Sequence, residues 1–459
     1  MSQSPTAATH TTMRVKPSGK LGNPAPAPIT LHGLDMLLPH LFIRLHFFFS
    51  PDKAASDTVG HLKASLADVL DLYPPVAGSL RPGPDGKLAF HSDGRGVDFI
   101  QHDVPYPYSD VPEGDSASLG PQVDVERMPD GPVFAVKVTR FSCGTIALCV
   151  AMDHWLTDLQ GCVDFVATWA KVARGEVVAP SSVPHDWTHA PLRYFAEVDA
   201  SPLVAPPDDT PSYTPPAPPS GPPPPATQLR YFVSDSSLQA LKADCTPRTN
   251  GNADKTGGVS WISSGDALTA LLWRASVRCR RSADLGKEKM DTLALAMDGR
   301  DRSPGKVMAN GQYLGNFIVP ATMGLPVETL LQKDMDTLSY VAGTIRKELL
   351  EQTKPEVIKA KVEFVESAEP NAGQIVQQFD TLLTNWARFA LAGPVNDFGW
   401  GAPMGFAIGD IKLPTRGMVV IRANGGVLNV VALEEEAAEL LKGDEELLKY
   451  GEFVSRWIL

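Results

Sequence analysis

A proline-rich segment in the middle of the chain places the strongest limit on its fold. Residues 201–225 contain twelve prolines, and four of them are consecutive at 222–225. Because proline lacks a backbone N–H and fixes φ, such a segment cannot form a helix or pair within a sheet. We therefore predict a proline-rich crossover linker at 201–226, which joins an N-terminal lobe at 1–200 to a C-terminal lobe at 227–459. Each lobe is long enough to bury a core of its own.

The composition excludes several classes of protein. Hydrophobic residues make up 43% and charged residues 20% of the 459 positions, which is usual for a globular protein but not for a disordered or membrane-embedded chain. The formal net charge of −12 would repel phosphate backbones, so we expect no nucleic-acid partner. The five cysteines show no CxxC pair, and the N-terminal residues lack the apolar stretch of a signal peptide. We therefore expect reduced thiols, no metal site and a cytoplasmic location.

Strand and helix patterns alternate in both halves. Apolar residues at 59–73 follow helical spacing, and two strand-like runs follow at 133–141 and 145–152. In the second half a helix is expected directly after Ser263, and Asn-Gly-Gly at 424–426 indicates a hairpin between two further strands. The class is therefore mixed α/β in two lobes.

His154 is the first candidate for chemistry. It follows an apolar strand and precedes a helix that is expected to begin near Gly161, so it should lie at the rim of a sheet. An imidazole with a pKa near 6.5 is a natural base for a hydroxyl or an amine. Asp158, four residues later, could hold either the ring or the loop. The HxxxD pattern is weak, however, and taken alone it fits a loop histidine paired with a neighbouring acid better than a catalytic one.

The second candidate is the sequence Asp-Phe-Gly-Trp-Gly at 397–401. Its chance expectation in a chain of this length is on the order of 10⁻⁴. Two glycines beside Trp400 indicate a backbone bent to place the indole, and the alternative is a packed aromatic turn.

Together, HxxxD and DFGWG resemble the motifs of the BAHD family of acyl-CoA-dependent acyltransferases. Further motifs of the family occur in the right order along the chain. They are similar to Leu-Tyr-Pro-Pro-Val-Ala-Gly at 72–78, Trp-Ala to Arg-Gly at 169–175, Ser-Ser-Gly-Asp-Ala-Leu to Trp-Arg at 263–274, Asp-Gly-Arg at 298–300 and Tyr-Leu-Gly-Asn at 313–316.

The resemblance implies a two-lobed, chloramphenicol-acetyltransferase-like α/β fold, with mixed sheets, flanking helices and an active-site channel between the lobes. It also implies that His154 is a general base acting without a covalent acyl-enzyme. Asp158 would be structural and paired with Arg300. Trp400 would donate its indole N–H to the developing oxyanion, and Asp397 would brace the motif loop that contains Gly399 and Gly401.

Two residues near His154 depart from the family pattern. Most members read HxxxDG, whereas Leu159 and Gln160 follow Asp158 here, so the glycine arrives two residues late at Gly161. This change puts the placement of Asp158 in doubt. Asp153 precedes the histidine; it would raise the imidazole pKa if it pointed inward, but we expect it to be exposed.

Substrate contacts are weaker predictions. Ser263 and Ser264 cap a helix N-terminus, where free N–H groups could bind a phosphate of coenzyme A, although a plain helix cap is an equal interpretation. Arg388 could bind an acceptor carboxylate such as that of shikimate or quinate.

The sequence thus predicts an acyltransferase that moves a hydroxycinnamoyl, acetyl or similar group from acyl-CoA, a cosubstrate, to a hydroxyl of a small metabolite. We expect a monomer with no tightly bound cofactor and no membrane partner. The alternatives are N-acylation of an amine or polyamine, a condensation-type enzyme that uses carrier-bound acyl groups, and a catalytically decayed binding protein on the same scaffold.

Overall fold

The computed structural model describes residues 8–21, 25–37, 40–50, 57–111, 119–121, 131–184, 187, 191–203, 226–246, 258–285, 289–304, 313–367, 379–408 and 415–454. Most of the predicted linker, residues 204–225, lies outside these ranges.

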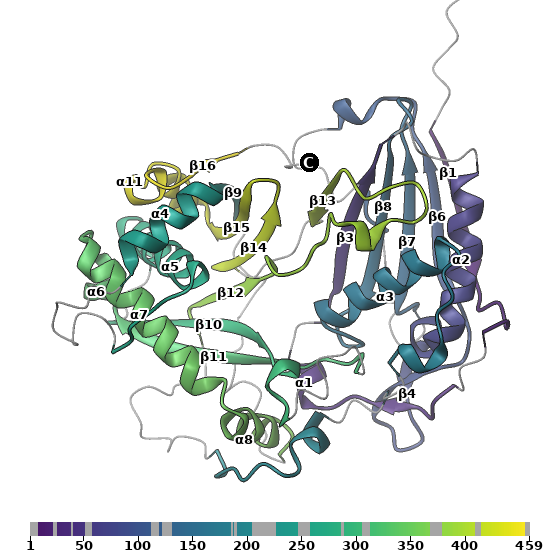
Figure 1. Cartoon of the computed structure of the whole chain (residues 1–459), viewed down its shortest axis with the longest axis horizontal. Coiled ribbons are helices and arrows are strands. Elements are labelled where there is room, and N and C mark those ends of the chain that lie inside the picture. The colour runs from purple at the N-terminus through teal and green to yellow at the C-terminus, as the bar shows by residue number, and fades with distance from the viewer. Residues whose placement is uncertain are drawn as a thin grey trace, which may run out of the picture.

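The first lobe is built on a six-stranded mixed sheet (Figure 1). Its β6 and β7 are parallel and its other neighbours are antiparallel. In order across the sheet, its strands are β1 (Thr9–Val15), β6 (Val97–Asp103), β7 (Phe134–Arg140), β8 (Ile146–Asp153), β3 (Phe42–Phe49) and β13 (Gly405–Ile408). A small sheet beside it contains β2 (Ile29–Thr30), β5 (Leu88–His91) and β4 (Ser79–Pro82).

The second lobe is built on a seven-stranded mixed sheet. Its strand β12 is parallel to both neighbours, so the carboxyl ends of β10 and β12 reach the same edge. In order, its strands are β11 (Ile318–Pro326), β10 (Met290–Asp298), β12 (Thr381–Asn385), β14 (Gly417–Ala423), β15 (Gly426–Glu434), β9 (Ala226–Ser234) and β16 (Glu452–Phe453).

Helices cover both large sheets. In the first lobe these are α1 (Gly33–Met36), α2 (Thr58–Leu72) and α3 (Leu159–Ala173). In the second lobe they are α4 (Asp235–Cys245), α5 (Ser264–Ser282), α6 (Val327–Leu331), α7 (Met335–Gln352), α8 (Pro355–Val365), α10 (Glu435–Leu441) and α11 (Glu445–Leu448). None of the described helices is long and apolar enough to cross a membrane.

The helix α3 shows why these segments fold as they do. Its apolar residues recur at helical spacing, and Phe165, Val166 and Trp169 are fully buried against the first sheet. Burial of one such side chain stabilises the fold by roughly 1.5–3 kcal/mol. The helix begins at Leu159, directly after Asp158, whose carboxylate caps it, and ends at Ala173. Its neighbour α2 ends at Leu72, because Pro74 and Pro75 follow and proline cannot continue a helix.

One strand of the first sheet comes from the second half of the chain. The four residues of β13 pair antiparallel with β3, from Gly405 opposite Phe48 to Ile408 opposite Leu45. In Figure 1 the green β13 accordingly lies beside the purple β3. The predicted mixed α/β fold in two lobes is confirmed, and this strand ties the two lobes together.

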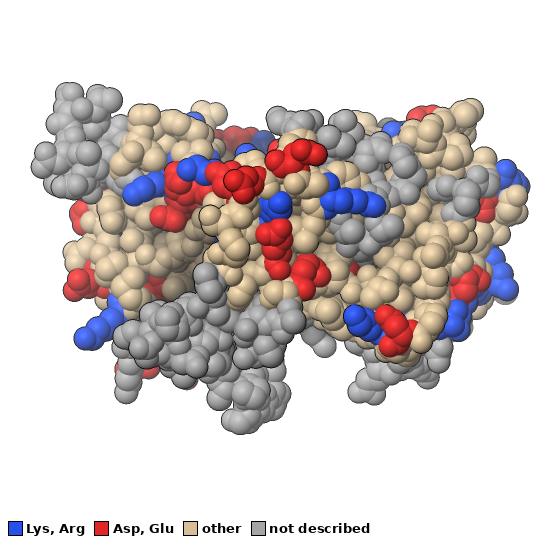
Figure 2. All heavy atoms as spheres, turned by 90° about the horizontal axis from the view of Figure 1, so that it is seen from below, with Lys and Arg blue, Asp and Glu red and all other residues tan. Residues whose placement is uncertain are grey.

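Charges on the described surface are mixed in sign. Figure 2 shows lysine and arginine side chains next to aspartate and glutamate on the face seen from below. All five cysteines are free thiols, and only Cys143 is exposed.

Candidate active site

His154 follows the last residue of β8, in a five-residue loop before α3. Its backbone N–H donates to the carbonyl oxygen of Leu41, just before β3, at 2.9 Å. In the ring, Nδ1 is buried and makes no hydrogen bond of normal geometry, and no hydrogen bond of Nε2 is found among the described residues. The residue is only partly buried, so Nε2 is the nitrogen left open to a substrate.

Burial lowers the pKa of His154 below its usual value of 6.5. The backbone of His154 and Thr157 and the carboxylates of Asp158 and Asp153 raise it, but burial outweighs them. The imidazole is therefore neutral at pH 7, which is the form that can accept a proton.

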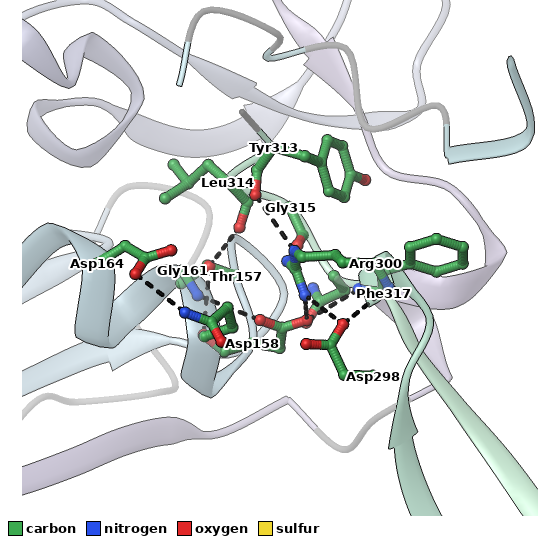
Figure 3. Close-up of polar contacts among 12 residues, drawn as sticks. Thr157, Asp158, Gly161, Asp164, Asp298, Arg300, Tyr313, Leu314, Gly315 and Phe317 are labelled. Carbon is green, nitrogen blue, oxygen red and sulfur yellow. Dashed lines mark hydrogen bonds and ion pairs between the residues drawn. The ribbon is translucent and has the colours of Figure 1, made fainter. Parts of the chain in front are cut away.

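Asp158 lies four residues after His154, and its carboxylate bonds to residues of the second lobe. Its Oδ2 accepts from Arg300 Nη1 at 2.7 Å and from the backbone N–H of Phe317 at 2.9 Å, and its Oδ1 accepts from Gly161 N at 3.3 Å (Figure 3). Both Asp158 and Arg300 are buried. Arg300 also contacts Asp298 at 3.3 Å and donates to the carbonyl oxygens of Tyr313 and Gly315. The carboxylate thus joins the histidine loop to the second lobe.

The late glycine fits this loop. Leu159 is the first residue of α3 and is buried, while Gly161 packs against the second lobe. A Cβ on Gly161 would collide with the backbone oxygen of Leu314 and with the hydroxyl of Thr157. That hydroxyl donates to the same Leu314 oxygen. Glycine is therefore needed at position 161, and Leu159 leaves Asp158 in contact with Arg300.

Asp153 corrects one expectation. It is fully buried and not exposed, because its carboxylate is used within the loop. Its Oδ1 accepts from the backbone N–H of Trp155 at 2.9 Å, and its Oδ2 lies 3.2 Å from His40 Nε2. The His40 ring stacks on Trp155 at 3.8 Å between centroids, which packs this side of the loop.

Arg388 lies in the loop after β12 and is already surrounded by acceptors. It contacts Asp298 at 2.5 Å, Asp301 at 3.4 Å and the side-chain oxygen of Gln160 at 3.3 Å. Since Gln160 belongs to α3, Arg388 bridges the two lobes beside the histidine loop. Its side chain is 45% exposed, and its guanidinium has little unmatched charge left for an acceptor carboxylate.

Ser263 and Ser264 begin α5 as predicted, but Ser263 is occupied. Its hydroxyl oxygen accepts from Asp266 N at 3.1 Å and from Arg346 Nη2 at 2.8 Å. In turn, the carboxylate of Asp266 accepts from Ser263 N at 2.6 Å. This is a capping box with an arginine added. Gly265, the next residue, lies near Asn385 at the carboxyl end of β12, so the start of α5 faces the edge that carries the site.

The DFGWG loop packs against the first lobe, where its aromatic rings contact Phe49 of β3 and Trp169 of α3. Asp397 Oδ1 accepts from Gly399 N and Gly401 N at 2.8 Å each, and both glycines have positive φ, 108° and 102°. Arg174, just after α3, donates to the Asp397 carbonyl oxygen. The Trp400 ring lies 5.8 Å from that of Phe49. Its indole nitrogen is buried and has no hydrogen-bond partner in the part of the chain that the structure describes.

The structure does not bring Trp400 to His154, as its predicted catalytic role would require. Phe49 and Phe42 are the two ends of β3, about 23 Å apart at ~3.3 Å per residue, and His154 lies beyond the Phe42 end. Along α3, Gly399 lies near Ala173 at the last turn, whereas the loop of His154 precedes the first turn, about 22 Å away at 1.5 Å per residue. An oxyanion donor must lie about 3 Å from the reacting oxygen.

A cavity of about 310 Å³ lies between β13 and the tip of the β14–β15 hairpin. Its lining is mostly apolar and includes Phe389, Leu391, Phe406, Ile408, Ile421 and Leu428. Ile408 lies opposite Leu45 of β3, and Leu41, four residues before Leu45, bonds to the backbone of His154. At ~3.3 Å per residue along the strand, this end of the cavity lies roughly 13 Å from the His154 loop.

Two further residues, Asn316 and Asp35, hold the loop of His154, and the sequence assigned them no role. Asn316 Nδ2 donates to the carbonyl oxygens of His154 and Trp155 and to Asp35. Only the family stretch at 313–316 pointed to Asn316, without a role, and no local pattern pointed to Asp35.

The protein thus has two α/β lobes that meet at the loop of His154. This arrangement is that of an acyltransferase whose site lies between its lobes. A family model described as "Transferase family" matches residues 7–448. The chain belongs to this family, the BAHD acyl-CoA-dependent acyltransferases.

Individual relatives are distant but match over most of their length. The chain is 26% identical over 416 residues to omega-hydroxypalmitate O-feruloyl transferase of Arabidopsis thaliana, covering 86% of this chain and 82% of the relative. It is 28% identical over 401 residues to hydroxycinnamoyl-CoA:5-hydroxyanthranilate N-hydroxycinnamoyltransferase HHT1 of Avena sativa, covering 83% and 85%. Among solved structures, F. graminearum TRI101 complexed with coenzyme A and T-2 mycotoxin shares the fold, with a TM-score of 0.74, 16% identity and coverage of 93% and 100%.

Proposed function

We propose that this protein transfers a hydroxycinnamoyl, acetyl or similar group from CoA to a hydroxyl of a small metabolite, with His154 as the general base. The observation that carries the proposal is the position and the protonation of the His154 imidazole. It stands at a strand end with Nε2 open, and burial keeps it neutral at pH 7.

In the proposed reaction one proton moves from the acceptor to His154 and then to the leaving CoA. Nε2 of His154 takes the proton of the acceptor O–H as the oxygen attacks the thioester carbonyl. The tetrahedral intermediate then collapses, the C–S bond breaks, and the thiolate of CoA takes the proton from the imidazolium. The products are an ester and free CoA, and no covalent acyl-enzyme forms. Asp158 and Arg300 do not touch the substrate in this scheme, but hold the loop in place.

Coenzyme A is a cosubstrate here and not a resident cofactor. We place a phosphate of it near Ser264, at the start of α5, where the helix N-terminus faces the shared edge of β10 and β12. Ser263 has its own partners in the capping box and would contribute less. For Arg388 we favour bracing of the loop over binding of a carboxylate. A monomer in the cytoplasm remains our expectation.

One observation favours an amine acceptor as a second candidate. Around the guanidinium groups of Arg300 and Arg388 the described residues include four carboxylates, those of Asp158, Asp164, Asp298 and Asp301. Two positive charges against four acidic groups would attract a cationic amine and repel a carboxylate. The Avena relative, an N-hydroxycinnamoyltransferase by name, shows that the family includes N-acylation.

The test is a matrix of reactions with the purified full chain. Acetyl-, malonyl- and p-coumaroyl-CoA are each incubated with panels of alcohols and amines, and the products are identified by mass spectrometry. Ester or amide formation that is lost in His154→Gln supports the proposal. A chain that binds these thioesters but forms no product with any acceptor would instead support a decayed binding protein.

A further inference from the structure

We propose that Asn316 and Asp35 are positioning residues for His154, acting through the peptide between His154 and Trp155. The inference rests on His154 being the base. Asn316 Nδ2 donates to the carbonyl oxygen of His154 at 2.9 Å and to that of Trp155 at 3.1 Å. The same nitrogen donates to Asp35 Oδ1 at 3.0 Å.

The chemistry of these contacts fixes the orientation of the Asn316 amide. All three partners are acceptors, so only the NH₂ end can face them. The side chain is fully buried, and its Oδ1 has no hydrogen bond among the described residues. The amide group thus makes all of its described hydrogen bonds through one end, and two of its three partners belong to the His154 loop.

Asp35 holds the amide from the other side. It is fully buried in α1, and its Oδ2 accepts from His32 N at 3.1 Å. The helix α1 is itself fastened to the end of α8, where His32 Nδ1 lies 2.8 Å from Glu366 Oε1. A Cβ on Gly33 would lie 2.6 Å from Val365, so the two helices are in close contact. A continuous set of contacts therefore runs from α8 through α1 and Asn316 to the histidine.

The backbone has to orient this histidine because no side chain among the described residues bonds to its ring. The nearest acid in the motif, Asp158, is bonded to Arg300, and Nδ1 of the ring lacks a hydrogen bond of normal geometry. The backbone of His154 is held on one side by Leu41 and on the other by Asn316. A displacement of about 1 Å at a reacting group can cost up to 10²-fold in rate, so these two contacts bear directly on the base.

The test compares Asn316→Leu with a matched control elsewhere. Asn429 in β15 is also fully buried, its Nδ2 donates to a single backbone carbonyl, that of Tyr231, and its Oδ1 also has no partner among the described residues. Asn429→Leu therefore removes a similar hydrogen bond without touching the loop. Asp35→Asn and Asp35→Leu form a second pair, because asparagine can still accept from Asn316 and leucine cannot.

Two readouts separate positioning from general stability. Asn316→Leu should lower kcat at least tenfold with the KM for p-coumaroyl-CoA changed by less than about twofold, while Asn429→Leu keeps its kcat. Asp35→Leu should follow Asn316→Leu, and Asp35→Asn should retain most of the rate. The second readout is an NMR titration of ¹³C-labelled histidine, with His154 assigned from the signal missing in His154→Gln. Opening of the loop to water should move its pKa up toward 6.5 in Asn316→Leu and in Asp35→Leu, but not in Asn429→Leu.

An unchanged titration of His154 in both Asn316→Leu and Asp35→Leu would overturn the inference, as would equal loss of kcat in Asn429→Leu. The NMR readout needs no substrate. If the titration moves as expected but His154→Gln remains active, the positioning of the imidazole stands and the proposed base falls.

Discussion

Asp158 and Arg300 lie 142 positions apart in the chain and form a buried ion pair between the two lobes, with Oδ2 and Nη1 2.7 Å apart. The same carboxylate caps α3 through Gly161 N and accepts from Phe317 N. The Asp158 side chain thus lies at the end of the His154 loop, caps the start of α3 and binds the second lobe to both segments.

We expect Asp158→Ala to destabilise the fold by about 3–5 kcal/mol, because Arg300 would be left buried without this partner. Asp158→Asn keeps the helix cap and should lose less. Urea unfolding measures both. The control is Asp235→Ala, whose pair with Arg422 is exposed and should be worth less than about 1 kcal/mol. Unfolding of both Asp158 variants at the parent's urea concentration would show that the pair is not structural.

Trp400→Phe should leave kcat within about twofold of the parent, since the indole N–H has no partner among the described residues and lies on the order of 20 Å from His154. Trp400→Ala should instead cost about 3–5 kcal/mol of stability, because a large buried ring is lost beside Phe49. Thermal melts and steady-state rates measure these effects. A tenfold loss of kcat in Trp400→Phe, with the parent's melting temperature, would restore the oxyanion role that we reject.

Arg388→Ala should affect a carboxylate acceptor and its methyl ester by the same factor, for example shikimate and methyl shikimate. The reason is that Asp298 and Asp301 already match the charge of the guanidinium. The stability loss should stay below about 1 kcal/mol, since the residue is half exposed. The measurement is kcat/KM for both acceptors. A rise in KM confined to the free acid would identify Arg388 as a carboxylate-binding residue.

The rate should be lost only at a pH below the usual histidine range. A general base works in its neutral form, which dominates above its pKa, and burial lowers the pKa of His154 below 6.5. The kcat should therefore hold as pH falls from 8 to 6.5 and decline at lower pH. Any residual rate of His154→Gln should not follow this decline. A midpoint above 6.5 in the parent would mean that the imidazole is not buried as described.

Local patterns predicted much of the fold and part of the site. The end of α2 at Leu72 followed from the two prolines after it, and the hairpin of β14 and β15 from Asn-Gly-Gly at 424–426. His154 at a strand end and Ser263 as a helix cap could be predicted for the same reason, since each depends on a few neighbouring residues.

Contacts between distant segments could not be predicted in this way. The four residues of β13 carry no strand pattern that names β3 as their partner, more than 350 positions earlier. Asn316 and Asp35 meet at His154 only because three separate segments converge there. Trp400 shows the opposite case: a rare motif indicated importance, but the sequence held no information on its distance from the base.

The single-turnover rate of His154→Gln tests the central claim most directly. With saturating p-coumaroyl-CoA and an acceptor found active in the product screen, the chemical step should slow by roughly 10²–10⁴-fold, or about 3–5 kcal/mol of barrier, while the melting temperature and CoA affinity stay near those of the parent. A variant that keeps more than about a tenth of the parent's rate under these conditions would contradict the assignment of His154 as the base.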